Sequence, residues 1–262
     1  MKKLKKMATG ERKAKDPVVA KVTCISGLHA VASLLAHRPE RILRLQVSDR
    51  QDLRMQDLLG AAAKLGISVE KVSKETLDAA ASGKPQGVVA FCHPAALLTE
   101  SDLPVLIAET KEPPFLLVLD GVQDPHNLGA CLRNADAAGV TAVIIPKDRS
   151  SGLTEAVARA AAGAAETVPL VQVTNLARTL AMLKEHNIWI YGASGDTEKT
   201  LYQEKLTGPV AIVLGAEGTG LRRLTSEHCD VLLKIPMQGT VESLNVSVAA
   251  GVFLFEVVRQ RG

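Results

Sequence analysis

Apolar residues in the second half of the chain gather in short, nearly continuous runs, and the segments between these runs are amphipathic. Such runs are typical of strands in a parallel sheet that helices cover on both faces. The intervening segments repeat apolar residues at helical spacing, which indicates helices. We therefore expect an open α/β fold with a parallel sheet. The predicted strands are 115–119, 142–145, 168–173, 188–193, 210–214 and 231–235, and the predicted helices are 128–138, 153–163, 175–186, 221–227 and 244–259.

A smaller α/β pattern precedes this region, with predicted helices alternating with predicted strands. Four prolines, at 94, 104, 113 and 114, then interrupt regular structure, and only a short helix at 103–109 is expected among them. We therefore divide the chain into a basic tail at 1–21, a small domain at 22–92, a linker at 93–113 and a large domain at 114–262. In the small domain, the predicted helices are 27–35, 53–65 and 74–81, and the predicted strands are 42–47, 67–72 and 88–92.

Composition narrows the class of protein. The chain has 262 residues, of which 47% are hydrophobic and 23% are charged, as is usual for a globular domain in water. No apolar run approaches the roughly 18 residues of a membrane-spanning helix, so no membrane partner is expected. The cysteines at 24, 92, 131 and 229 lie far apart and form no C-x-x-C pair. This pattern predicts reduced thiols, a cytoplasmic protein and no metal site.

The net charge of +3 is unevenly distributed, because residues 1–21 hold eight Lys or Arg and two acids. This composition is typical of a disordered tail that contacts phosphates, and it fits a solvated, non-specific extension equally well. Aromatic residues make up only 3% of the chain. A nucleic-acid surface in this protein would therefore depend on contacts to phosphate and ribose rather than on aromatic stacking.

The first candidate site follows the predicted strand at 115–119, which Asp120 closes. Asn127 stands where the N-cap of the next helix is expected. Gly129 and Arg133 are four residues apart and share a helix face, on which the glycine lets another backbone approach closely. The planar, permanently charged Arg133 suits a phosphate or a developing alkoxide. Taken alone, the pattern equally fits an Asn cap, a Gly packing contact and an Arg in a surface ion pair.

The second candidate site is a turn after the predicted strand at 210–214, with Gly215, Gly218 and Gly220 around a single acid, Glu217. Glycines let a backbone approach a ligand closely. Such a turn is a weak signal alone. Its late position, the lack of a long helix directly after it and its spacing argue against a dinucleotide-binding fingerprint.

The third candidate site closes the last predicted strand with Ile235, Pro236 and Met237, and continues into the last predicted helix through Ser243 and Asn245. Pro236 fixes the backbone, and its apolar neighbours can sandwich an adenine ring. Polar side chains and free N–H groups at a helix N-terminus favour an anion such as a carboxylate. Ser243 as a plain N-cap is compatible with this interpretation, because capping and binding use the same groups.

In this order and spacing, the three sites resemble the signature motifs of the SpoU/TrmH family of S-adenosylmethionine-dependent RNA 2'-O-ribose methyltransferases. The stretches 115–127, 135–140, 143–149 and 173–178 resemble the branch that methylates a guanosine ribose in 23S ribosomal RNA. The resemblance implies a C-terminal SPOUT domain with a trefoil knot and an N-terminal RNA-binding domain similar to a ribosomal protein. It also implies a homodimer, S-adenosylmethionine as methyl donor, no metal, and 23S rRNA or a large-subunit precursor as partner.

The same resemblance assigns Asn127, Arg133, Glu217 and Asn245 to catalysis. In the family, the arginine lies by the target ribose and is often described as the base. A guanidinium is not deprotonated in proteins, so we expect Arg133 to orient the phosphate and stabilise the 2'-oxyanion. The residues expected to bind the methyl donor are Gly215, Gly218, Ile235, Met237, Ser243 and Leu244, with adenosine against the backbone of 215, 235 and 244.

Three alternatives remain at this stage. The first is an enzyme with the same chemistry on transfer RNA, against which the N-terminal domain argues because members acting on tRNA often lack it. The second is a non-catalytic rRNA-binding assembly factor, against which the intact motifs argue. The third is a resistance methyltransferase acting at another rRNA site, which the sequence discriminates poorly.

Overall fold

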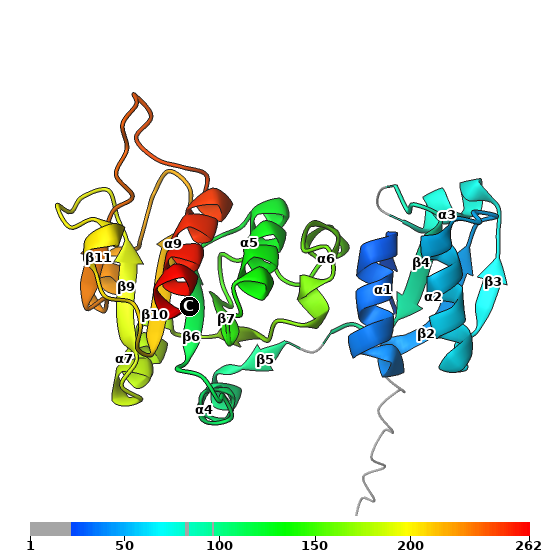
Figure 1. Ribbon diagram of the computed structural model, residues 1–262, viewed down its shortest axis with the longest axis horizontal. Helices are drawn as coiled ribbons and strands as arrows, with labels where there is room; N and C mark the ends of the chain where they lie inside the picture. The colour runs from blue at the N-terminus through cyan, green and yellow to red at the C-terminus, as the bar shows by residue number, and fades with distance from the viewer. Residues whose placement is uncertain (1–21, 82–83, 96) are drawn as a thin grey trace, which may run out of the picture.

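The computed structural model describes residues 22–81, 84–95 and 97–262, and the predicted tail at 1–21 lies outside the described residues. The described chain forms two α/β bodies that lie side by side, one around a four-stranded sheet and one around a seven-stranded sheet (Figure 1). The smaller body contains the N-terminal part of the chain, and the larger body carries the three motifs.

The four-stranded sheet has the order β1-β4-β2-β3. Strand β4 runs antiparallel to both its neighbours, and β3 pairs in parallel with β2. Apolar side chains such as Val31, Leu45 and Met55 are fully buried between this sheet and its helices. The elements are β1 (Thr23–Ser26), α1 (Leu28–His37), β2 (Ile42–Val47), α2 (Leu53–Lys64), β3 (Val69–Lys71), α3 (Lys74–Ala80) and β4 (Val88–Cys92). The sequence pattern did not predict strand β1.

The seven-stranded sheet has the order β11-β9-β10-β6-β7-β8-β5, and every strand pairing in it is parallel. The predicted parallel α/β sheet is therefore confirmed. Its strands are β5 (Leu98–Thr99), β6 (Phe115–Asp120), β7 (Ala142–Pro146), β8 (Leu170–Val173), β9 (Trp189–Ala193), β10 (Val210–Gly215) and β11 (Val231–Leu233), and its helices are α4 (Leu103–Ala108), α5 (Pro125–Ala137), α6 (Glu155–Ala160), α7 (Leu176–Glu185), α8 (Arg223–Glu227) and α9 (Val246–Arg261).

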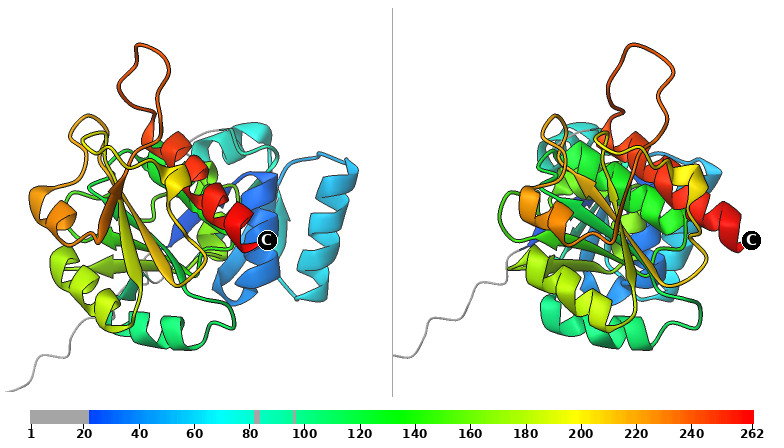
Figure 2. Two further views of the ribbon diagram at one scale, coloured as in Figure 1. Left: turned by 60° about the vertical axis from the view of Figure 1, so that its left-hand side comes forward. Right: turned by 90° about the vertical axis from the view of Figure 1, so that its left-hand side faces the viewer.

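Helices cover this sheet on both faces. Leu117 and Leu119 of β6 belong to the apolar core that contains Phe253 of α9, whereas Leu116 and Val118 belong to the core on the α4 and α7 side. Figure 2 shows α5 and α9 on one face, and α4 and α7 on the other. Burial of both faces explains why these strands read as continuous apolar runs.

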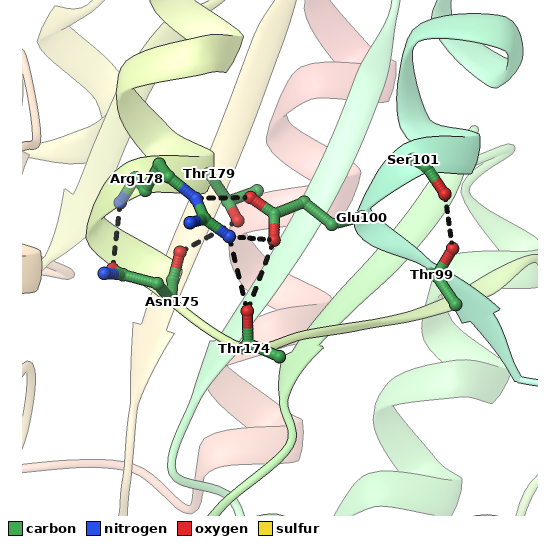
Figure 3. Close-up of polar contacts among 7 residues, drawn as sticks. All are labelled: Thr99, Glu100, Ser101, Thr174, Asn175, Arg178 and Thr179. Atoms are coloured by element: carbon green, nitrogen blue, oxygen red, sulfur yellow. Dashed lines mark hydrogen bonds and ion pairs between the residues drawn. The ribbon is translucent and has the colours of Figure 1, made fainter.

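The predicted linker, residues 93–113, holds β5 and α4, and β5 pairs with β8 at the edge of the large sheet. A side-chain cluster just after β5 secures this edge (Figure 3). Arg178 donates from Nε and Nη2 to the two carboxylate oxygens of Glu100, at 3.0 and 2.8 Å, and from Nη2 to Thr174 at 3.3 Å. The Arg178 guanidinium holds the pKa of Glu100 below its ordinary value.

The two bodies contact each other through α6 and the short helical turn that follows it. Ser26 donates to Glu155 at 3.1 Å, and Ser33 donates to the carbonyl of Gly163 at 2.9 Å. Arg41 forms an ion pair with Glu166, whose carboxyl group is buried. Burial raises the pKa of Glu166, although the Arg41 charge opposes this effect.

Candidate functional site

A cavity of about 740 Å³ opens where strands β9, β10 and β11 end. Ligands of open parallel sheets bind beyond the carboxyl ends of the strands, and this cavity lies at such an edge. The chain after each of the three strands contributes to its wall, as does the first half of α9. Glu217 also lines it. All six residues that the sequence assigned to the methyl donor lie in this wall: Gly215, Gly218, Ile235, Met237, Ser243 and Leu244.

The turn after β10 folds back on the end of its own strand. The backbone N–H of Gly220 donates to the carbonyl of Ala216 at 2.9 Å. A Cβ atom on Gly215 would lie 2.0 Å from the carbonyl carbon of Gly220, so no larger residue fits there. Gly218 and Gly220 adopt φ angles of 79° and 64°, in the left-handed region that favours glycine. The tight turn predicted from the glycines is therefore present, and it presents Glu217 to the cavity.

Asn127 is not the N-cap of α5, and the prediction that placed it there is wrong. Asp124 is the N-cap, and its carboxylate accepts from the backbone N–H groups of His126 at 3.2 Å and Asn127 at 3.1 Å. An Asp at this position followed by a Pro as first helical residue is a strong start signal. Because Asp124 caps the helix, the side chain of Asn127 is available for other contacts.

The side chain of Asn127 joins all three motifs. Its Nδ2 donates to Glu217 at 3.4 Å, and its Oδ1 accepts from Nδ2 of Asn245 at 3.0 Å. Asn245 is the N-cap of α9, and its Oδ1 accepts from Ser247 N at 2.9 Å and Ser247 Oγ at 2.6 Å. The helix thus begins two residues later than predicted, since Asn245 rather than Ser243 caps it. Three of the four predicted catalytic residues form one hydrogen-bonded chain.

Arg133 is the fourth predicted catalytic residue, and the structure does not bring it to this chain of side chains. It lies six residues after Asn127 on α5, about 9 Å further along the helix axis, and it does not line the cavity. Its side chain is exposed and has no hydrogen-bond or ion-pair partner within the described part of the chain. The predicted close approach at Gly129 is present, because a Cβ there would lie 2.7 Å from the carbonyl of Val157 in α6.

The sequence pattern did not single out the ion pair between Asp120 and Arg222. Asp120 ends β6 and is 1% exposed. Its Oδ2 accepts from the backbone N–H of Arg222 at 3.0 Å, and its Oδ1 accepts from Nε at 2.5 Å and from Nη2. The available signal was an acid that ends an otherwise apolar strand, followed a hundred residues later by two adjacent arginines.

The remaining candidate chemistry is limited. Burial raises the pKa of the thiols of Cys131 and Cys229 to about 12, so neither is a thiolate nucleophile near neutral pH. Within residues 22–81, 84–95 and 97–262, no three His, Cys, Asp or Glu side chains are grouped to hold a metal ion. Over the same residues, no helix has the length and apolar character that crossing a membrane requires.

Comparison with known proteins assigns this chain to a family. The model of the SpoU rRNA methylase family matches residues 114–255, which contain all three motifs. A second model, described as RNA 2'-O ribose methyltransferase substrate binding, matches residues 24–98. The chain belongs to the SpoU rRNA methylase family.

Particular relatives are similar over almost their whole length. The 23S rRNA (guanosine-2'-O-)-methyltransferase RlmB of Haemophilus influenzae is 58% identical over 240 residues, which are 90% of this chain and 97% of the relative. RlmB of Yersinia pestis is 56% identical over 91% of this chain and 97% of the relative. The structure of the SpoU methyltransferase AviRb from Streptomyces viridochromogenes with AdoMet has a TM-score of 0.77 at 22% identity. It covers 92% of this chain and 90% of AviRb, and it shows the same fold.

Proposed function

We propose that this protein transfers a methyl group from S-adenosylmethionine to the ribose 2'-hydroxyl of a guanosine in 23S rRNA or a large-subunit precursor. The observation that carries the proposal is the hydrogen-bonded chain of Glu217, Asn127 and Asn245 beside the cavity. The relatives named for this activity, at 58% and 56% identity, support the choice of substrate.

The residues of the cavity fit such a donor. The cavity volume of about 740 Å³ is typical of a small-molecule site and is large enough for S-adenosylmethionine. The glycine turn offers backbone without side chains, and Ile235, Met237 and Leu244 offer apolar surface for an adenine. Ser243 and the N-terminus of the 16-residue α9 suit the carboxylate of the donor's methionine part. When bound, the donor supplies a methyl group on a positively charged sulfur, which makes the sulfur an activated leaving group.

The protein's side chains act mainly by alignment. Glu217 accepts a hydrogen bond from the ribose, and Asn127 and Asn245 hold Glu217 and the ribose in one orientation. Arg133 orients the adjoining phosphate and stabilises the developing 2'-oxyanion. As the ribose 2'-oxygen bonds to the methyl carbon, the carbon–sulfur bond would break and the hydroxyl proton would leave to water. Holding this oxygen in line with the methyl carbon and the sulfur converts a bimolecular step into an effectively unimolecular one, which contributes much of the rate.

The working unit in this proposal is a homodimer in which Arg133 of one protomer serves the site of its partner. Two features support it. Arg133 does not line the cavity of its own protomer, and it has no hydrogen-bond or ion-pair partner in the described chain. Val248, Phe255 and Val258 of α9 are 52%, 46% and 36% exposed, which is unusual for apolar side chains along a helix that also packs in a core.

The proposal also includes the trefoil knot that the family resemblance implies. The segment between β9 and β10 contacts the last part of the chain on two sides. Thr200 bridges to Lys234. Gln260 near the end of α9 accepts from Leu206 N at 2.8 Å and donates to the carbonyl of Glu204 at 3.0 Å. These contacts hold the C-terminal segment against the loop, as a knot requires.

We assign the body at 22–92 to RNA binding, with a likeness to a ribosomal protein, and the body at 114–262 to catalysis, joined by 93–113. Support comes from the two separate sheets and from the two family models, which match 24–98 and 114–255. The tail at 1–21 adds a contact to phosphates, and the protein acts in the cytoplasm, where ribosomes are assembled.

The test is transfer of labelled methyl groups to unmodified 23S rRNA, a large-subunit precursor, 16S rRNA and tRNA in parallel reactions. Label in 23S rRNA or in the precursor, and in neither of the other two RNAs, is the expected result. Label in tRNA alone would keep the chemistry and overturn the substrate. Donor binding without transfer to any RNA or ribosome precursor would favour the non-catalytic assembly factor.

A further inference from the structure

One residue, Asp120, meets both ends of the glycine turn, the first end through its backbone and the second through its buried carboxylate. At the first end, Asp120 is paired in register with Gly215, so the sheet fixes the point where β10 enters the turn. At the second end, the Asp120 side chain binds Arg222, two residues after Gly220. The turn between these points is mostly exposed and lines the cavity.

The attachment at Arg222 is specific in geometry. The carboxylate accepts the backbone N–H of Arg222 with one oxygen, and with the other it accepts Nε and Nη2 of the same residue. Asp120 therefore fixes both the main chain and the guanidinium of Arg222. A buried carboxylate that loses its cationic partner destabilises its surroundings strongly, so Arg222 has little freedom to leave.

Within the described residues, the turn makes few other hydrogen bonds to the rest of the protein. Its bond between Gly220 and Ala216 is internal. The side-chain hydrogen bond from Asn127 to Glu217 is 3.4 Å long, at the long end of the range. Leu221, beside the turn, packs against the core on the α4 and α7 side, and the pair between Asp120 and Arg222 adds the stronger polar restraint on where the turn lies.

We propose that Asp120 is a positioning residue for the methyl donor: through Arg222 it holds the turn at 215–220 in the shape that receives the donor and presents Glu217. This inference rests on the proposed function for the identity of the ligand. It concerns donor binding and requires no contact between Asp120 and any substrate.

The chain offers a matched control for a purely structural ion pair. Glu166 is also a buried carboxylate paired with an arginine, Arg41, and it lies at the contact between the two bodies. Arg222→Ala and Arg41→Ala each leave a buried carboxylate without its guanidinium, so both should lower Tm. Only Arg222→Ala removes a restraint on the turn.

The experiment measures the Kd of S-adenosylmethionine by calorimetry without RNA, and hydrogen exchange of the amides at 216–221, well below Tm. The proteins are wild type, Asp120→Asn, Arg222→Ala, Arg222→Lys and Arg41→Ala, all full length. Asp120→Asn keeps the shape and an acceptor for the backbone N–H of Arg222, so it should fold. Arg222→Lys keeps the positive charge beside Asp120 and should retain part of the donor affinity.

We expect Asp120→Asn and Arg222→Ala to weaken donor binding about tenfold and to speed exchange at 216–221, with Arg41→Ala unchanged in both. The inference would be overturned if Asp120→Asn and Arg222→Ala had the donor Kd and the exchange rates of wild type. It would also be overturned if Arg41→Ala weakened donor binding as much as they do. If the wild type binds no donor, the proposed function fails, and the exchange rates still decide whether Asp120 holds the turn.

Discussion

The amide nitrogen of Asn245 donates to the side-chain oxygen of Asn127 at 3.0 Å, across 118 residues of sequence. One of these asparagines caps the last helix, and the other lies in the first turn of α5. Asn245 uses its oxygen for the cap and its nitrogen for Asn127, so the two functions can be separated by substitution.

Asn245→Asp should retain the cap and lose the contact to Asn127, because a carboxylate accepts from Ser247 but donates nothing to Oδ1. We expect the free energy of unfolding to stay within about 0.5 kcal/mol of wild type, whereas Asn245→Ala should lose about 1 kcal/mol. Methyl transfer should fall at least tenfold in both variants. Urea unfolding and single-turnover rates measure the two effects. Normal transfer by Asn245→Asp would show that the contact to Asn127 is dispensable.

Gly215→Ala should abolish donor binding and lower Tm, because its Cβ would overlap the backbone of Gly220 at 2.0 Å. Gly239→Ala is the matched control: it lies in the loop before α9, and a Cβ there meets no atom within 4 Å. That control should change stability by no more than about 0.5 kcal/mol. Calorimetric titration with the donor and thermal unfolding test both variants. Undiminished binding by Gly215→Ala would contradict the described turn.

Arg133→Ala and Asn127→Ala should each be inactive, and mixing the two proteins should restore activity if Arg133 serves the partner's site. A mixed dimer contains one intact site, so random exchange of protomers restores roughly a quarter of the sites. Phe255→Glu in both proteins should prevent the recovery, because it places a charge among the exposed apolar side chains of α9, Val248, Phe255 and Val258. Light scattering should then find monomers. No recovery from stable mixed dimers would place Arg133 in its own protomer's site.

Acid should loosen the edge strand β5. Arg178 lowers the pKa of Glu100 in the folded state below its ordinary 4.5. A lowered folded pKa gives stability that is present above the unfolded value and is lost as pH falls through the folded one. Wild type should therefore unfold at higher urea than Glu100→Gln near pH 6, and the difference should shrink below about pH 4. A difference that is constant with pH would exclude the ion pair as its cause.

The sequence predicted those parts of the fold that depend on local patterns. The apolar run at Val210–Gly215 was clear because both faces of its strand are buried, and the strand at Ile42–Val47 has the predicted bounds. Strand β5 was missed because its two residues have no pattern of their own, and only pairing with β8 makes them a strand.

In the candidate site, too, the sequence predicted the features that depend on local patterns and missed those that depend on tertiary folding. The residues predicted to bind the donor lie around one cavity because they follow strand ends in sequence, and parallel strand ends meet at one edge. The start of α5 was misplaced because Asn127 and Asp124 are both good caps, and only the proline after Asp124 distinguishes them. The partnership of Asp120 with Arg222 could not be predicted, since it depends on tertiary folding across 102 residues.

The most direct test of the central claim is nucleoside analysis of unmodified 23S rRNA after reaction with labelled S-adenosylmethionine. Wild type and Glu217→Gln should be compared, because the exposed Glu217 can lose its charge without loss of core packing. We predict label in 2'-O-methylguanosine with wild type and at least tenfold less with Glu217→Gln, at equal Tm. Label on a base, or on the ribose of another nucleoside, would contradict the proposed reaction.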